Sequence, residues 1–221
     1  MVDDRPTALH FGEESLPQTR EASAALRRLT GLLLSLEHEH PTVDAMIAQI
    51  TSWEDELSKV APRDPRPRLG PGMNDDQRIY LDHAFDIGAF NPVFPEYRFE
   101  QIDAESAGGT VSFPVVFEGP PGLVHGGVLA SFFDCVIQHH NCAVGVAGKT
   151  RSLAVTYRRP TPLSTALGFD VVREITERGV RSVGRLTLDG EVLCMGELDS
   201  VAMSAEQLAA RDFGRRRGDR S

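Results

Sequence analysis

The sequence has few cysteines, a deficit of basic charge and no long apolar run. Its three cysteines form neither an even set nor a C-x-x-C pair, which predicts reduced thiols rather than a disulfide framework. No stretch of 18 or more residues is apolar, so a membrane-spanning helix is not expected. The 32 acidic residues outnumber the 23 basic ones, and the net charge of −9 argues against nucleic acid as the main partner.

The first 20 residues also lack targeting features. They are acidic and interrupted by Pro6 and Pro17, without the basic start and apolar stretch of a secretory signal. They are also unlike an arginine-rich organelle transit peptide. Together with the cysteine pattern, this predicts a cytoplasmic protein.

Two N-terminal segments carry apolar residues at helical spacing. Residues 20–36 and 43–60 are therefore predicted to form an αα-hairpin, within an N-terminal extension over residues 1–60. Two helices alone bury little surface, so the pair is expected to pack on the main domain or on its copy in a partner chain. Their apolar stripe is expected to be core or interface; it comprises Leu26, Leu29, Leu33, Val43, Ile50 and Trp53.

A proline-rich segment over residues 61–79 separates this extension from the rest and predicts a semi-rigid linker. Residues 80–204 form the predicted main domain, and the polar residues 205–221 a frayed tail. Asp189-Gly190 is a strong hairpin signal. The domain is expected to hold strands over 97–102, 110–117, 150–159, 166–176, 180–188 and 191–203, and a largely buried helix over 128–147. This order predicts an α+β fold, with an antiparallel sheet wrapped around one long central helix.

Chemistry is concentrated where the central helix begins. Gly126 and Gly127 let the backbone approach a ligand closely, and we count both as candidate ligand contacts. The first amides of a helix have no partner inside it and lie at the positive end of its dipole. A carbonyl oxygen that becomes an oxyanion would be stabilised there.

Asp134 lies eight residues after Gly126, in the apolar run FFDCVI. A carboxylate in such surroundings is costly to bury without a partner, which makes it a candidate catalytic base. The alternative is that Asp134 lies on a solvated face of the helix or bonds to a backbone group.

Two segments carry a resemblance to a known family: GPPGLVHGGVLASFFD (residues 119–134) and TRSLAVTYRRPTPL (residues 150–163). The sequence resembles hotdog-fold acyl-CoA thioesterases of the phenylacetate-pathway (PaaI) type, and is similar to those of the carboxyl-terminal modulator protein type. The resemblance runs over residues 90–203 and implies hydrolysis of an acyl-CoA to a carboxylic acid and free CoA. It also implies no metal and no cofactor, and a homodimer or a dimer of dimers.

The resemblance assigns roles to individual positions. Gly126 would offer its N–H to the thioester carbonyl, and Asp134 would be the general base or the nucleophile, facing a pocket completed by the neighbouring protomer. Thr150, sixteen residues later, would orient the attacking water, and His125 would support the loop. One position departs from the pattern, because some relatives place Asn six residues before the His, where this chain has Gly119.

Further polar residues have more than one reading. Gln138 lies one turn after Asp134, where it could bond to the carboxylate or to substrate, or line a dimer seam. Arg158 and Arg159 are candidates for the phosphates of CoA, although strand neighbours face opposite ways and one could be solvated. The adjacent histidines 139–140 point about 100° apart on a helix and make a poor metal pair.

Two other functions remain open from the sequence. The chain could be a non-catalytic acyl-CoA-binding hotdog protein, with the helical hairpin as an interaction arm. A hotdog hydratase or dehydratase is weaker, because the His/Asp or His/Glu motifs of those enzymes are absent.

Overall fold

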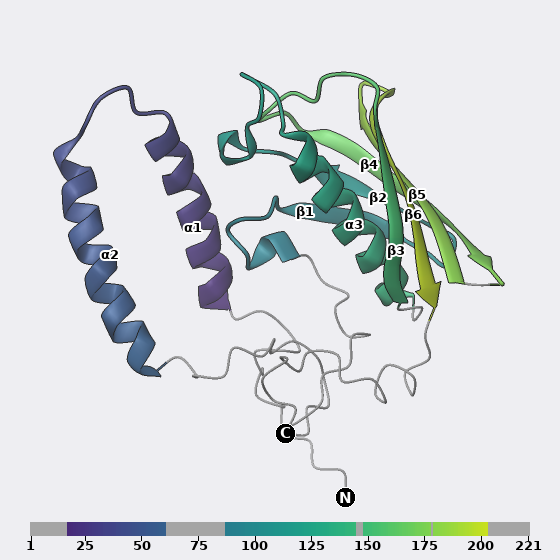
Figure 1. The fold of residues 1–221 in the computed structure, drawn as a ribbon, viewed down its shortest axis with the longest axis horizontal. Coiled ribbons are helices and arrows are strands. Elements are labelled where there is room, and N and C mark those ends of the chain that lie inside the picture. Colours follow the sequence, from purple (N-terminus) through teal and green to yellow (C-terminus); the bar gives the residue numbers. More distant parts are fainter. Residues whose placement is uncertain (1–16, 61–86, 145–147, 178, 203–221) are drawn as a thin grey trace, which may run out of the picture.

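The computed structural model describes residues 17–60, 87–144, 148–177 and 179–202. A six-stranded sheet curves around one long helix, α3 (Gly126–Ala143), and a separate pair of helices stands beside it (Figure 1). These are α1 (Pro17–Leu34) and α2 (Pro41–Val60), so the predicted αα-hairpin is present. The α+β architecture with a central helix is the one the sequence predicts.

The sheet is antiparallel throughout, with strand order β1-β2-β4-β5-β6-β3. The strands are β1 (Tyr97–Ile102), β2 (Ser106–Val111), β3 (Gly148–Tyr157), β4 (Leu167–Thr176), β5 (Gly179–Leu188) and β6 (Glu191–Ala202). Strands β1 and β3 are therefore the two edges of the sheet. The predicted turn joins β5 to β6, where Asp189 and Gly190 both have positive φ, at 51° and 81°, as a tight two-residue hairpin requires.

Helix α3 is buried against the concave face of the sheet. Phe132, Phe133, Val136 and Ile137 are each 0% exposed, which explains the nearly continuous apolar sequence of this helix. The sheet comes close to α3 at Gly196, where an added Cβ would lie 2.6 Å from the Phe133 ring. Glycine at that point leaves the space that the ring fills.

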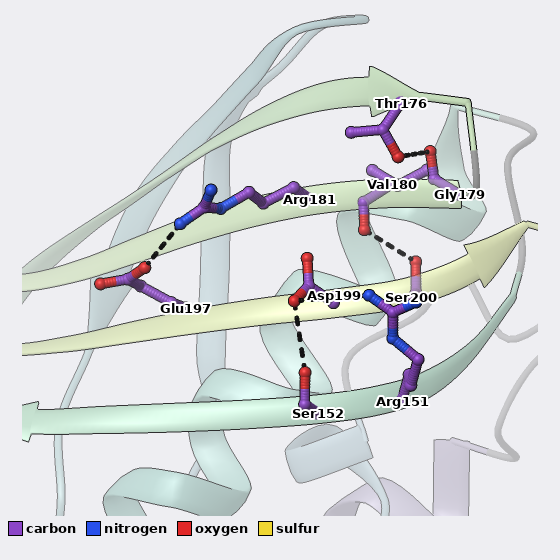
Figure 2. A network of polar contacts seen from close by, with 9 residues as sticks. All are labelled: Arg151, Ser152, Thr176, Gly179, Val180, Arg181, Glu197, Asp199 and Ser200. Atoms are coloured by element: carbon purple, nitrogen blue, oxygen red, sulfur yellow. Dashed lines mark hydrogen bonds and ion pairs between the residues drawn. The ribbon is translucent and has the colours of Figure 1, made fainter.

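The outer face of the sheet carries polar and charged cross-strand pairs. Arg181 pairs with Glu197 across β5 and β6 at 3.0 Å, and the Ser152 hydroxyl donates to Asp199 at 3.3 Å between β3 and β6 (Figure 2). Charged cross-strand pairs of this kind are typical of a solvated sheet face. The chemistry is therefore to be sought on the side of α3.

Several predicted boundaries differ from the structure by a few residues, and two of the differences have a clear cause. The strand expected over 110–117 ends at Val111, and a 3-10 helix, η3 (Val115–Phe117), follows it. Pro114 has no N–H to continue a ladder, so the chain turns there. Helix α3 begins at Gly126 rather than at residue 128, because the side chain of His125 caps it.

The face by which α1 docks also differs from the prediction. Ser23 and Arg27 are its buried residues, whereas Leu26 and Leu33 are 48% and 37% exposed. The Ser23 hydroxyl donates to the carbonyl of Phe90, and the Arg27 guanidinium to those of Gly88 and Asn91. Hydrogen bonds to backbone carbonyls in and just after the 3-10 helix η2 (Ile87–Ala89) thus hold α1 on the domain, and the leucine stripe is not its buried face.

Helix α2 has no buried residue, and in Figure 1 it lies on the far side of α1 from the sheet. Ile50 and Trp53 of the predicted stripe are 37% and 54% exposed, so the stripe is not core in the single chain. The predicted linker (61–79) and tail (205–221) lie outside the described residues, as do both ends of the predicted domain 80–204.

Candidate active site

The N-terminus of α3 presents one available amide. The His125 Nδ1 accepts a hydrogen bond from the Gly127 N–H at 3.0 Å. The His125 carbonyl accepts from the N–H groups of Val128 and Leu129, at 2.9 and 3.3 Å. Among the described residues no acceptor is found for the Gly126 N–H. This amide therefore lies at the positive end of the helix dipole with its hydrogen available to a ligand, whereas that of Gly127 is occupied.

Tyr157, at the end of β3, covers this helix terminus. Its hydroxyl donates to the Gly126 carbonyl at 2.8 Å, and a Cβ on Gly126 would lie 3.3 Å from the tyrosine ring. Burial, and secondarily Cys194, raise the pKa of Tyr157 above its ordinary value, so the hydroxyl remains a donor. Tyr157 is absent from the residues predicted for the site; its only signal is its place directly before Arg158 in the second motif.

A shallow groove of about 390 Å³ lies beside Gly126. Leu123, Val124 and Leu129 give it an apolar wall, and Arg158 and Arg159 lie at its border. Both arginines are exposed. Arg159 forms an ion pair with Glu191 at 3.2 Å, whereas Arg158 has no side-chain partner within the described part of the chain.

Asp134 lies further along α3 and is half-buried. Its Oδ1 accepts a hydrogen bond from the hydroxyl of Thr150, on β3, at 2.7 Å. The same Thr150 oxygen accepts from Gln138 Nε2 at 2.9 Å. The structure thus brings together three predicted site residues, Asp134, Gln138 and Thr150, in one hydrogen-bonded chain.

The neighbouring thiol is not a competing nucleophile. Burial, and then the negative charge of Asp134, raise the pKa of Cys135 to about 12. A thiol that stays protonated at neutral pH is a poor nucleophile. Of these two neighbouring groups, the Asp134 carboxylate is therefore the better candidate for a reactive group.

The two halves of the predicted site are far apart in one chain. Eight residues of α-helix separate Gly126 from Asp134, a rise of about 12 Å. A base and an oxyanion donor that serve one carbonyl must each lie about 3 Å from the reacting atoms. Gly126 and Asp134 of the same chain therefore cannot act on the same thioester.

Gly119 leaves no room for the Asn that some relatives have. A Cβ there would lie 2.7 Å from the His125 Cα and 3.0 Å from its Cβ. The loop before α3 is thus packed more tightly around His125 than an Asn side chain would allow.

The described residues contain no group of three or more His, Cys, Asp or Glu side chains placed to hold a metal ion. The two adjacent histidines have other contacts, since His139 Nδ1 lies 2.8 Å from the Tyr97 hydroxyl and His140 Nε2 2.8 Å from the Asp103 carbonyl. Within the same residues, no helix is both long and apolar enough to cross a membrane.

Comparison with known proteins includes an extensive likeness to a solved structure. No protein-family model matches the sequence. The crystal structure of the thioesterase superfamily protein RHA08564 has a TM-score of 0.67 and 28% sequence identity, and the alignment covers 83% of this chain and 94% of that chain. The segment Ile87–Ala202 is only about half of the chain, so this likeness extends beyond the sheet and its helix.

Shorter likenesses cover about half of the chain. A hypothetical thioesterase protein with coenzyme A from Streptococcus pneumoniae is 16% identical over 49% of this chain and 90% of its own, with a TM-score of 0.47. A phenylacetic acid degradation-related protein from Ralstonia eutropha is 21% identical over 48% and 84%, with a TM-score of 0.44.

Proposed function

Because this chain belongs to the hotdog-fold thioesterase superfamily, we propose that it hydrolyses an acyl-CoA thioester to a carboxylic acid and free CoA. The observation that carries the proposal is the half-buried carboxylate of Asp134. It accepts a hydrogen bond from Thr150 of β3, and it lies on the same helix whose first amide is available. Thioester hydrolysis needs a base and an oxyanion stabiliser, and it needs neither a metal nor a redox cofactor.

In the proposed reaction Asp134 is the general base. A water molecule attacks the thioester carbon while its proton passes to the carboxylate, and the carbonyl oxygen becomes an oxyanion bonded to the Gly126 N–H. The C–S bond then breaks, and the CoA thiolate leaves as the carbonyl re-forms. The proton held by Asp134 returns to the thiolate, which balances the reaction.

The 12 Å rise between Gly126 and Asp134 leads us to propose a homodimer with shared sites. Edge strand β3, beside α3, has a neighbouring strand on one side only in the described sheet, so its other side can pair with a second copy. A two-fold axis there would run the two α3 helices antiparallel, so that Gly126 of one chain approaches Asp134 of the other. A dimer of dimers would preserve the same pairing.

The chemistry at the groove border favours CoA as the carrier of the acyl group. Arg158 and Arg159 border the groove next to Gly126, and guanidinium groups suit phosphate oxygens. We therefore propose that the nucleotide phosphates of CoA lie at Arg158, with the thioester at the Gly126 amide.

The test is to measure the hydrolysis of a panel of acyl-CoAs through the release of the free CoA thiol. Asp134→Asn keeps the volume and an acceptor for Thr150 but removes the base, so we expect kcat to fall about 100-fold or more. Ser131→Ala, on the same helix, serves as the control, because within the described structure the Ser131 hydroxyl bonds only to the Gly127 carbonyl. Undiminished turnover by Asp134→Asn would refute the mechanism, and tight acyl-CoA binding without turnover by the wild type would support a binding protein instead.

A further inference from the structure

Gln138 is a buried polar residue one helical turn after Asp134. It is only 8% exposed, and its Nε2 donates to the Thr150 hydroxyl oxygen at 2.9 Å. Residues four apart share a helix face, so Gln138 and Asp134 approach Thr150 from the same side. No direct hydrogen bond joins Gln138 to Asp134 in the described structure, so their connection runs through Thr150.

The hydrogens of this chain have one consistent arrangement. A threonine hydroxyl has one hydrogen and two lone pairs, whereas an ionised carboxylate only accepts. The Thr150 hydrogen must therefore point at Asp134 Oδ1, 2.7 Å away. Gln138 must then present its NH₂ group, not its carbonyl, to Thr150, which fixes the orientation of the amide.

We propose that Gln138 is a positioning residue, which fixes the Thr150 hydroxyl with its hydrogen on Asp134. The inference rests on the proposed thioesterase function and deepens it. With one lone pair taken by Gln138, Thr150 keeps a single lone pair, and Asp134 keeps its second oxygen. A water molecule that donates one hydrogen to each is held in one orientation, with its own lone pair directed outward at the substrate.

The stability of the fold does not account for the glutamine. Gln138 Oε1 is buried and has no hydrogen-bond partner among the described residues. An unpartnered buried carbonyl oxygen costs free energy of folding that an apolar side chain of similar size avoids. A leucine at this position would therefore fold at least as well, and what the glutamine supplies is the donor to Thr150.

Gln138→Leu tests the proposal. We expect kcat for the best acyl-CoA substrate to fall about 10-fold with KM unchanged, while the thermal midpoint stays equal or rises. Ser182→Ala is the matched control, since Ser182 on β5 is buried and its hydroxyl, like Gln138 Oε1, has no hydrogen-bond partner among the described residues. Its kcat should remain that of the wild type.

A double-mutant cycle separates positioning from an independent effect. In a Thr150→Val background, Gln138 has no hydroxyl to orient, so Gln138→Leu should not lower kcat further. A full additional 10-fold loss in that background, or an unchanged kcat in the single variant, would overturn the positioning role while leaving the thioesterase function standing. A wild type that hydrolyses no acyl-CoA would overturn the proposed function itself, and with it the role of Gln138.

Discussion

Thr150 and Tyr157 lie seven residues apart on strand β3, yet both side chains contact helix α3. Successive side chains of a strand point to opposite faces, so residues seven apart should face opposite ways. The pairing with β6 resolves this, because Thr150 pairs with Ser200 whereas Ser152 pairs with the adjacent Asp199. Arg151 is thus an extra residue, and the bulge turns Thr150 toward Asp134.

Deletion of Arg151 should keep Thr150 on the side of α3. Thr150 would then directly precede Ser152 and lie six residues before Tyr157, so regular alternation turns both Thr150 and Tyr157 inward, with Thr150 still opposite Ser200. We therefore expect the deletion to retain most of the wild-type kcat, whereas Thr150→Val, which lacks the hydroxyl, should lower kcat by roughly 10-fold or more. Arg151→Ala keeps the backbone bulge and loses only the exposed contact with Asp199, so it should also retain wild-type kcat. A deletion variant as impaired as Thr150→Val would show that the bulge itself, and not only the face of the strand, positions the hydroxyl.

Shared sites should allow two inactive variants to complement each other. Gly126→Val crowds the Tyr157 ring and blocks the amide, and Asp134→Asn removes the base. In a mixed dimer one site carries both changes and the other carries neither. Co-expression with two different tags should therefore restore roughly a quarter of wild-type kcat, because half of the dimers are mixed and each has one intact site. Mixed dimers as inactive as the parent variants would place each site within one chain.

The two arginines at the groove should differ in their effect on KM. Arg158 has no side-chain partner among the described residues, so Arg158→Met should raise KM for acyl-CoA by roughly 10-fold. Arg159 is held by Glu191, and Glu191→Gln should lower KM a few-fold by releasing it. The control is the matching acyl-pantetheine, which lacks the nucleotide phosphates. A similar change in KM for that substrate would argue against phosphate recognition.

Much of the fold follows from periodicity and turn chemistry. The apolar run of α3, the positive-φ turn at Asp189-Gly190 and the four long C-terminal strands are all local signals in the sequence. The strand predicted over 110–117 fails because its alternation continues past Pro114, where the ladder cannot. The docking face of α1 could not be predicted from the sequence either. Arg27 binds backbone carbonyls more than 60 residues away, and no side-chain pattern indicates where such carbonyls will lie.

The candidate site was predictable only in part. The glycines at the start of α3 and the acid eight residues on are visible as a spacing, and Thr150 follows from the resemblance. The contact of Tyr157 with Gly126 depends on where β3 ends against α3. The orientation of Thr150 depends on a bulge, which is a property of the register between β3 and β6 rather than of either sequence alone.

Arg27 should be the residue that keeps the helical hairpin on the domain. Arg27→Met removes the guanidinium that donates to the carbonyls of Gly88 and Asn91, and it releases Glu96. We expect the docked state to lose about 2–3 kcal/mol, seen as faster hydrogen exchange throughout α1 with the sheet still protected. Arg28→Met, at the exposed neighbouring position, is the control. Unchanged protection of α1 in Arg27→Met would assign the docking to other contacts.

His140 should make the fold less stable in mild acid. It is fully buried, its Nε2 bonds to the Asp103 carbonyl, and its Nδ1 has no partner among the described residues. Burial, together with the charge of Arg173, lowers its pKa below the ordinary value of 6.5, against the opposing influence of the Asp103 carbonyl and charge. The folded protein therefore holds His140 neutral at a pH where the unfolded chain already binds a proton.

The sign of the effect follows from that difference. As the pH falls below 6.5, the unfolded chain takes up a proton that the folded protein does not, so the free energy of unfolding decreases. The slope for this one group is at most about 1.4 kcal/mol per pH unit, and the effect is absent above pH 7.5. Carboxylates whose pKa is lowered by hydrogen bonds, such as Asp103, lose their contribution to stability only as the pH falls below about 4.

Urea unfolding at pH 7.5 and 5.5 measures the difference in the free energy of unfolding between the two conditions. This difference should be smaller in His140→Gln than in the wild type, whereas the exposed His38→Gln should retain the full difference. Equal differences in all three proteins would mean that His140 is not the group that takes up the proton on unfolding.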